Sequence, residues 1–197
     1  MGLFKPDKGR VLVDGEDVSN MGRQELSVFR QRMGMVFQSS ALFDSMTVGD
    51  NVAFPLREHS KLSEAEIMQK VKEKLAIVDL HDVEDKFPAE LSGGMRKRVG
   101  LARAIVREPK IVLYDEPTTG LDPLTTENVD EMIITAREKL GVTSVVISHD
   151  IGSAFHIGDH IAMLHDGHIV EEGPPEKLRR SQEPHTQHFL ATWFGRT

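Results

Sequence analysis

A serine followed by two glycines begins the stretch of this chain whose residue types most directly suggest chemistry. Ser92, Gly93 and Gly94 precede a basic segment with apolar side chains at helical spacing, which predicts a glycine-rich turn followed by an amphipathic helix. A helix start offers unpaired backbone N–H groups and a positive dipole end, and glycines let an anion approach the backbone closely. The turn is therefore a candidate phosphate-binding site, although the same residues also fit an ordinary capped helix.

Two adjacent carboxylates, Asp115 and Glu116, follow a short apolar run at 111–114. Such a run is typical of a buried parallel strand, and open α/β folds bind ligands beyond the carboxyl ends of these strands. An aspartate at this position can hold Mg²⁺ through a bound water, because Mg²⁺ takes few protein carboxylates and retains its waters. The glutamate can act as a general base; its alternative is a solvated carboxylate at a strand end.

Three further polar residues lie where strands end or helices begin. Gln38 follows the apolar segment 34–37, and His149 follows the β-branched segment 144–148. Taken alone, the glutamine is an ordinary polar strand end, and the histidine is a capping or core residue. Asp122 precedes a proline and has the pattern of a helix N-cap. Only the order of the motifs along the chain gives these three residues a functional interpretation.

Segments with the lengths of strands and helices alternate through the second half of the chain. The predicted strands cover 111–115, 143–148, 160–164 and 168–171, and the predicted helices cover 123–140 and 150–157. This alternation predicts an α/β fold with a parallel sheet flanked by helices. Asp166 and Gly167 predict that the last two strands form a hairpin at an edge of the sheet. The polar tail carries Trp193 and Phe194, which either pack back on the domain or meet a partner.

A mainly helical region separates the two parts of the chain that form the sheet. Within it, Ser63 has the pattern of a helix cap, with Glu66 at the third helical position. At 197 residues the chain is long enough for one good core, so we expect a single domain. Within 1–197 we expect an α/β core at 1–40 and 108–173, a helical lobe at 41–107 and a tail at 174–197.

Composition argues against several classes of protein. The net charge of -7 argues against a general nucleic-acid binder, because contacts with phosphates need an excess of Lys and Arg. The absence of cysteine excludes disulfides and cysteine metal sites. No stretch approaches the roughly 20 uninterrupted apolar residues of a spanning helix, so we expect a chain that does not itself cross a membrane.

The order of the motifs resembles that of one known family. A Leu-Ser-Gly-Gly turn at 91–94 is followed by a basic helix, the Asp115-Glu116 pair, Thr-Gly-Leu-Asp at 119–122 and Ser-His-Asp at 148–150. Over nearly the whole chain this order resembles the nucleotide-binding subunit of ABC transporters. Segments 54–59 and 95–98 look most like the Mla/MCE branch, which handles phospholipids. The resemblance implies a P-loop NTPase (RecA-like) core with a mainly parallel sheet and a helical signature lobe.

The resemblance also implies a reaction, the hydrolysis of ATP to ADP and phosphate, with ATP and Mg²⁺ as cofactors. By their places in the motifs, the catalytic residues are Glu116, His149 and Gln38, the nucleotide contacts are Ser92, Gly93, Gly94 and Asp122, and the Mg²⁺ ligands are Asp115 and Gln38. In this family two cassettes face head to tail. The Ser-Gly-Gly turn of one cassette then caps the terminal phosphate that is held by the other.

The partners implied by the resemblance are a transmembrane ABC permease, a second cassette and a lipid-binding MCE-type protein. The implied location is peripheral, at the cytoplasmic face of the inner membrane, with no nucleic-acid partner. Nothing in a cassette touches cargo, so a lipid substrate follows from the branch resemblance alone. A cassette of a polar-solute importer is the alternative.

One motif of the family does not occur in these residues. The phosphate-binding loop G-x-x-x-x-G-K-[ST] requires a Gly-Lys pair, and no such dipeptide is present in the sequence. The loop holds the β- and γ-phosphates, so we expect these 197 residues to be inactive alone. We interpret the chain as an amino-terminally truncated cassette. The alternative is a degenerate paralogue that serves as a non-catalytic, permease-docking module.

Overall fold

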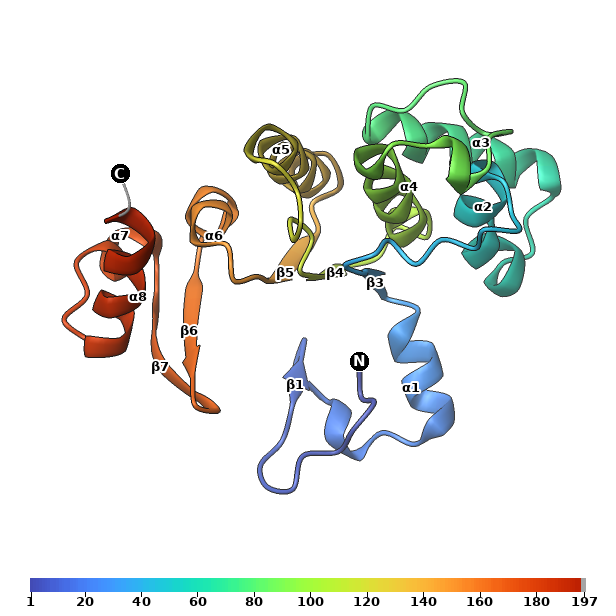
Figure 1. The fold of residues 1–197 in the computed structure, drawn as a ribbon. Helices are drawn as coiled ribbons and strands as arrows, with labels where there is room; N and C mark the ends of the chain where they lie inside the picture. Colours follow the sequence, from blue (N-terminus) through green and yellow to red (C-terminus); the bar gives the residue numbers. More distant parts are fainter. Residues whose placement is uncertain (196–197) are drawn as a thin grey trace.

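Three parallel strands, paired in the order β3-β4-β5, form the sheet on which the candidate residues lie. The computed structural model describes residues 1–195 (Figure 1). The strands are β3 (Met33–Val36), β4 (Ile111–Asp115) and β5 (Thr143–Ile147). Val36 lies opposite Tyr114, and Asp115 lies opposite Ile147. Because the strands run in the same direction, their carboxyl ends meet at one edge of the sheet. The predicted α/β class is confirmed.

Helices cover one face of this sheet. α4 (Gly93–Ile105) and α5 (Pro123–Leu140) pack in one core with Val112 and Tyr114 of β4, which are at most 1% exposed. Gly34 of β3 lies so close to α4 that a Cβ there would sit 2.5 Å from the carbonyl oxygen of Ala104. On the other face Ile147 is 61% exposed. The side chains of each strand therefore alternate between a packed face and an open face.

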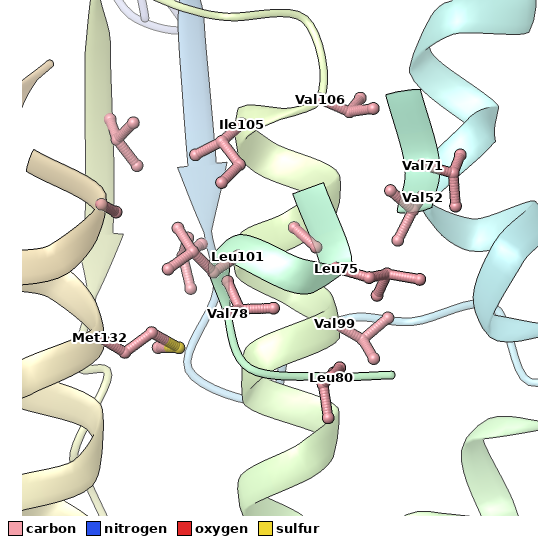
Figure 2. Packing of buried hydrophobic residues seen from close by; sticks show 14 of the residues in the cluster. Val52, Val71, Leu75, Val78, Leu80, Val99, Leu101, Ile105, Val106 and Met132 are labelled. Carbon is pink, nitrogen blue, oxygen red and sulfur yellow. The ribbon is translucent and has the colours of Figure 1, made fainter. Parts of the chain in front are cut away.

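Three helices contribute a large part of the core. α2 (Val48–His59) and α3 (Glu64–Ile77) pack with α4 on one side of the sheet (Figure 1). Figure 2 shows Val52, Val71, Leu75, Val99 and Leu101 in one cluster, and each of them is at most 1% exposed. Burial of this apolar area is the main driving force that holds α4 in place.

Side-chain caps begin these helices as the sequence predicts. The Ser63 hydroxyl accepts from the backbone N–H of Glu66, and the Glu66 carboxylate accepts from the N–H of Ser63 at 2.7 Å. The side chains of Ser92 and Asp122 also accept from backbone N–H groups at the starts of α4 and α5, without the reciprocal bond from the third helical residue. Each such cap stabilises its helix by about 1 kcal/mol.

The remaining elements, apart from one short 3-10 helix near the middle, lie toward the two ends of the chain. They are β1 (Leu12–Val13), β2 (Glu16–Asp17), η1 (Val18–Asn20) and α1 (Arg23–Arg30), then η2 (Pro88–Glu90) before α4, and finally α6 (Ile151–Ile157), β6 (Ile161–His165), β7 (His168–Gly173), α7 (Pro175–Arg179) and α8 (Pro184–Phe194). Figure 1 shows β6, β7, α7 and α8 on the side of the sheet away from α2 and α3. The Phe194 ring meets Phe155 of α6 edge-on, with centroids 6.1 Å apart, so the tail packs back on the domain. Within 1–195, no helix combines the length and apolar character that a bilayer span requires.

The pairing of the last two strands corrects one expectation. β6 and β7 form a hairpin through Asp166 and Gly167, as predicted, but this hairpin is a two-stranded sheet of its own. In the described part of the chain no strand pairing joins it to β5, so its predicted place at an edge of the main sheet is wrong. The spacing of apolar residues indicates which residues are extended, but not which edge a strand pairs with.

A buried carboxylate joins α5 to α6. Asp130 is 3% exposed and accepts a hydrogen bond from the Ser153 hydroxyl. Burial raises the pKa of Asp130, and the bond from Ser153 opposes this only in part. A raised pKa favours the protonated form in the folded state. This contribution to stability is present below about pH 4, the unfolded value, and is lost as the pH rises through the raised pKa.

We therefore expect Asp130→Asn to be more stable than the wild type at pH 7.5, because the amide keeps an acceptor for Ser153 and carries no buried charge. The rise in melting temperature should be about 2–4 °C, the size of a change near 1 kcal/mol in a domain of this length. The difference should disappear near pH 4. Glu127→Gln, at an exposed site on the same helix, is the control. An unchanged or lower melting temperature at pH 7.5 would contradict this expectation.

Candidate functional site

β4 delivers two carboxylates to the edge of the sheet. Asp115 is the last residue of the strand and is exposed. The backbone N–H of Glu116 donates to the carbonyl oxygen of Ile147 at 2.9 Å, which extends the pairing with β5 by one residue. Glu116 has φ of 48°, in the left-handed region that non-glycine residues rarely adopt. Such conformations cost about 1–3 kcal/mol and cluster at functional sites.

The Glu116 carboxylate is held by two neighbouring side chains. Its Oε2 accepts from the Thr119 hydroxyl at 2.8 Å and lies 2.8 Å from Nδ1 of His149. Partial burial raises the pKa of Glu116, but the hydrogen bonds with Thr119 and His149 outweigh it and bring the pKa below its ordinary value. Both bonds end on the same oxygen, so neither engages Oε1. The structure thus holds an ionised carboxylate at the end of β4 whose Oε1 takes part in neither of these two contacts.

The third predicted residue of this edge follows β3. Gln38 is exposed and lies two residues beyond Val36, the end of the strand that pairs with β4. Lys97 of α4 connects the two neighbouring loops: its ammonium donates to the carbonyl oxygen of Pro117 and lies 3.4 Å from that of Gln38. Partial burial lowers the pKa of Lys97. The ends of β3, β4 and β5 therefore bring the three predicted catalytic residues to one edge.

A second group of predicted residues lines a groove of about 770 Å³. Ser92, Gly93 and Gly94 form one wall, at the start of α4, and Asp122 lies on the other, at the start of α5. The two helix starts are close, since a Cβ on Gly94 would lie 3.8 Å from Cγ2 of Thr125. Hydrogen bonds from Thr125 lower the pKa of Asp122, whose carboxylate caps α5. The groove therefore combines two helix N-termini with small residues.

The groove and the carboxyl edge of the sheet are two separate sites on the folded molecule. Glu116, His149 and Gln38 do not line the groove among the described residues. They connect to it through the loop 117–121, which leads from β4 to the cap of α5. A single chain thus presents two partial sites, one rich in backbone donors and one with an ionised carboxylate.

The donor set suits a magnesium ion that also binds phosphate. Within 1–195, no group of three or more His, Asp or Glu side chains is arranged to hold a metal by itself. Mg²⁺ binds through one or two protein ligands and otherwise keeps waters and phosphate oxygens. Asp115 and Gln38 offer one exposed carboxylate and one exposed amide on adjacent strand ends, which fits that requirement.

The fold is similar to that of solved ABC transporter proteins. The ATP-binding cassette MJ0796, in a dimeric post-hydrolysis state bound to ADP and Pi, aligns with a TM-score of 0.77 and 33% identity over 88% of this chain and 76% of that one. A second match is cbiO1 from Clostridium perfringens, part of the ABC transporter complex cbiONQ. It has a TM-score of 0.84 and 30% identity over 96% of this chain and 75% of that one.

Sequence comparison agrees with the fold. The family model described as ABC transporter matches residues 1–119. This chain belongs to the ABC transporter family. The predicted fold, an ABC cassette of the P-loop NTPase class, is confirmed by these matches.

Relatives within the ABC transporter family agree with the branch predicted from the motifs. The probable ribonucleotide transport ATP-binding protein mkl of Mycobacterium tuberculosis is 45% identical over 190 residues, which are 96% of this chain and 53% of that protein. The intermembrane phospholipid transport system ATP-binding protein MlaF of Escherichia coli is 43% identical over 189 residues, 96% of this chain and 70% of MlaF. The chain thus spans about half the length of the mkl proteins that it matches.

Two residues contact the candidate site without having been predicted to do so, although both lie in motifs that carry the resemblance. Thr119 belongs to the Thr-Gly-Leu-Asp motif, and its hydroxyl donates to the Glu116 carboxylate across a short turn. Lys97 lies in the basic segment 95–98, which supports the resemblance without giving this lysine a role. Its contacts are 20 and 59 residues away in sequence, so no local pattern could have found them.

Proposed function

We propose that this chain is the ATP-binding and ATP-hydrolysing subunit of a transporter, and that the transporter moves phospholipids or related lipids. The observation that carries the proposal is the Glu116 carboxylate, held between Thr119 and His149 at the carboxyl edge of the sheet. Hydrolysis of a terminal phosphate depends on positioning a water and on stabilising charge. An ionised carboxylate with a free oxygen can orient that water and accept its proton.

Each predicted residue has a role in this proposal. Glu116 is the general base, and His149 orients it through the contact at 2.8 Å. His149 would also contact the terminal phosphate of a bound nucleotide. Mg²⁺, when bound with the nucleotide, neutralises phosphate charge. Asp115 would hold it through a water, and Gln38 would reach it from the neighbouring strand end. The groove residues Ser92, Gly93, Gly94 and Asp122 would face the nucleotide of a second cassette in a head-to-tail dimer.

Cargo and partners rest on the relatives' names. MlaF is named for an intermembrane phospholipid transport system, which favours a lipid cargo. An ABC permease and an MCE-type protein as partners follow from the motif resemblance. The chain would then lie at the cytoplasmic face of the inner membrane. The mkl proteins are named for ribonucleotide transport, which favours a polar solute instead. Transport assays in vesicles with the permease, using labelled phospholipid and labelled ribonucleotide, separate the two.

Hydrolysis is tested by supplying the phosphate loop that these residues do not contain. A chimaera places the loop-bearing segment of MlaF before residue 1, and magnesium-dependent phosphate release is measured beside the 197-residue chain alone. We expect turnover by the chimaera and none by the chain alone. A chimaera that binds ATP but releases no phosphate would refute a catalytic role and favour a permease-docking module. Turnover by the chain alone would refute the requirement for the loop.

The turn formed by Ser92, Gly93 and Gly94 would cap the nucleotide of a second cassette. Mixed with full-length MlaF, the chain should change the ATPase rate, because its Ser92 turn can cap a nucleotide held by the loop of MlaF. Ser92→Arg should reduce this change at least about tenfold, since a bulky cation blocks the groove; tenfold corresponds to about 1.4 kcal/mol. Ser63→Arg is the matched control, because Ser63 caps α3 in the same way but does not line the groove. No change of rate on mixing would count against the capping role.

A further inference from the structure

One side of α4 carries three residues at a spacing of three, Lys97, Gly100 and Arg103, and all three meet the segment 38–41. Such residues lie along one face of a helix. The guanidinium of Arg103 donates to the carbonyl oxygens of Ser40 and Ala41, each at 2.7 Å. The ammonium of Lys97 lies 3.4 Å from the carbonyl oxygen of Gln38. α4 therefore contacts this segment at three of its four residues.

The backbone of the segment has an unusual conformation. Ser40 has φ of 63° and Ala41 has φ of 44°, so two consecutive non-glycine residues lie in the left-handed region. Each costs roughly 1–2 kcal/mol relative to ordinary backbone. The conformation turns both carbonyl groups toward one guanidinium. The two bonds to Arg103 offset a cost that the segment would otherwise relieve by rearranging.

Packing leaves little room between α4 and the segment. Ser40 is 2% exposed, and a Cβ on Gly100 would lie 3.2 Å from Cβ of Ser40. Burial lowers the pKa of Arg103, and the two carbonyl oxygens that its guanidinium contacts replace part of the hydration that the buried cation loses. The ring of Phe43 also lies near the guanidinium, with its centroid 6.0 Å from Cζ. A cation in this position is a specific structural link between helix and loop.

We propose that Arg103 is a positioning residue for Gln38: it holds the strained segment 38–41 against α4 and so makes the position of Gln38 follow that of the helix. α4 begins at the Ser92 turn, so one rigid element carries the nucleotide-capping turn and fixes the loop with the predicted Mg²⁺ contact. This inference rests on the proposed function for the meaning of Gln38. The physical link itself does not depend on it.

The test measures the segment directly in the 197-residue chain by NMR. The reporters are hydrogen exchange at the Ser40 amide, which donates to the carbonyl oxygen of Phe37 at 2.9 Å, and the backbone order parameter of Gln38. In Arg103→Met we expect exchange at Ser40 to rise at least tenfold, and the order parameter of Gln38 to fall from about 0.85 toward 0.6. Arg103→Lys, which keeps the charge but loses one of the two bonds, should restore both readouts in part.

Arg107→Met is the matched control, because Arg107 is the same residue type just beyond the end of α4 and bonds Gln31 instead. It should leave Ser40 and Gln38 unchanged. If hydrogen exchange rises equally along the core of α4, Arg103 only stabilises the fold. If exchange at Ser40 and the order parameter of Gln38 are unchanged, Arg103 does not hold the segment 38–41. Either result overturns the proposal. The NMR experiment needs no nucleotide. A chimaera without activity would therefore count against the proposed function alone, and unchanged NMR readouts in Arg103→Met would count against the Arg103 proposal alone.

Discussion

Glu116→Gln should lower ATP hydrolysis by the loop-bearing chimaera at least about 100-fold, while the affinity for ATP stays within about threefold. General acid–base catalysis contributes roughly 10²–10⁴ in rate, and the amide cannot accept a proton from water. The substitution keeps the shape of the side chain and an acceptor for the Thr119 hydroxyl, which bonds Glu116 at 2.8 Å. The loss should therefore fall on the chemical step, and phosphate release at saturating ATP measures it.

The surface of the protein offers a matched control for this substitution. Glu131 of α5 pairs with His156 of α6 at 3.2 Å, which reproduces a glutamate–histidine contact away from the edge of the sheet. Glu131→Gln should leave the rate unchanged. The loss at Glu116 should also be the same at pH 6.5 and 8.0, because its lowered pKa keeps the carboxylate ionised throughout that range. A Glu116→Gln chimaera with more than a third of the wild-type rate would show that another group takes the proton.

Local patterns in the sequence were sufficient to predict the elements that deliver the site. The helix at 123–140 has the predicted bounds, because its Asp-Pro start and Gly141 end are both local signals. The strand at 111–115 was also predicted, because a short apolar, β-branched run indicates a strand without knowledge of the strands that pair with it. With these bounds, the carboxylates at the end of the strand fall at the edge where α/β folds bind ligands.

Contacts between distant residues were not predictable in this way. Arg103 reaches carbonyl groups 62 and 63 residues away, and Glu116 reaches His149 across 33 residues. The histidine was found because it belongs to a motif, whereas the arginine looks like any surface cation of an amphipathic helix. The left-handed conformation of Ser40 has no signal in sequence either, because serine rarely adopts it and tertiary contacts impose it here.

Both partial sites depend on the position of α4. The free energy lost on truncating one of its core residues tests how strongly packing fixes that position. Leu101→Ala should destabilise the domain by about 2–5 kcal/mol, because the side chain is fully buried and its removal leaves a cavity that the neighbours fill only in part. Figure 2 shows Leu101 in the cluster with Leu75 and Val78, between α4 and the end of α3. In a chain of this length the melting temperature should fall by roughly 5–15 °C.

Leu124→Ala is the control for this loss, because Leu124 is the same residue type at 70% exposure on α5 and should change stability by no more than about 0.5 kcal/mol. Urea unfolding, followed by circular dichroism, gives both values. A cost below about 1 kcal/mol for Leu101→Ala would mean that α4 adapts its packing freely. A helix that shifts so easily could not keep Arg103 on the segment 38–41, nor the Ser92 turn beside Asp122, so the same measurement bears on both partial sites.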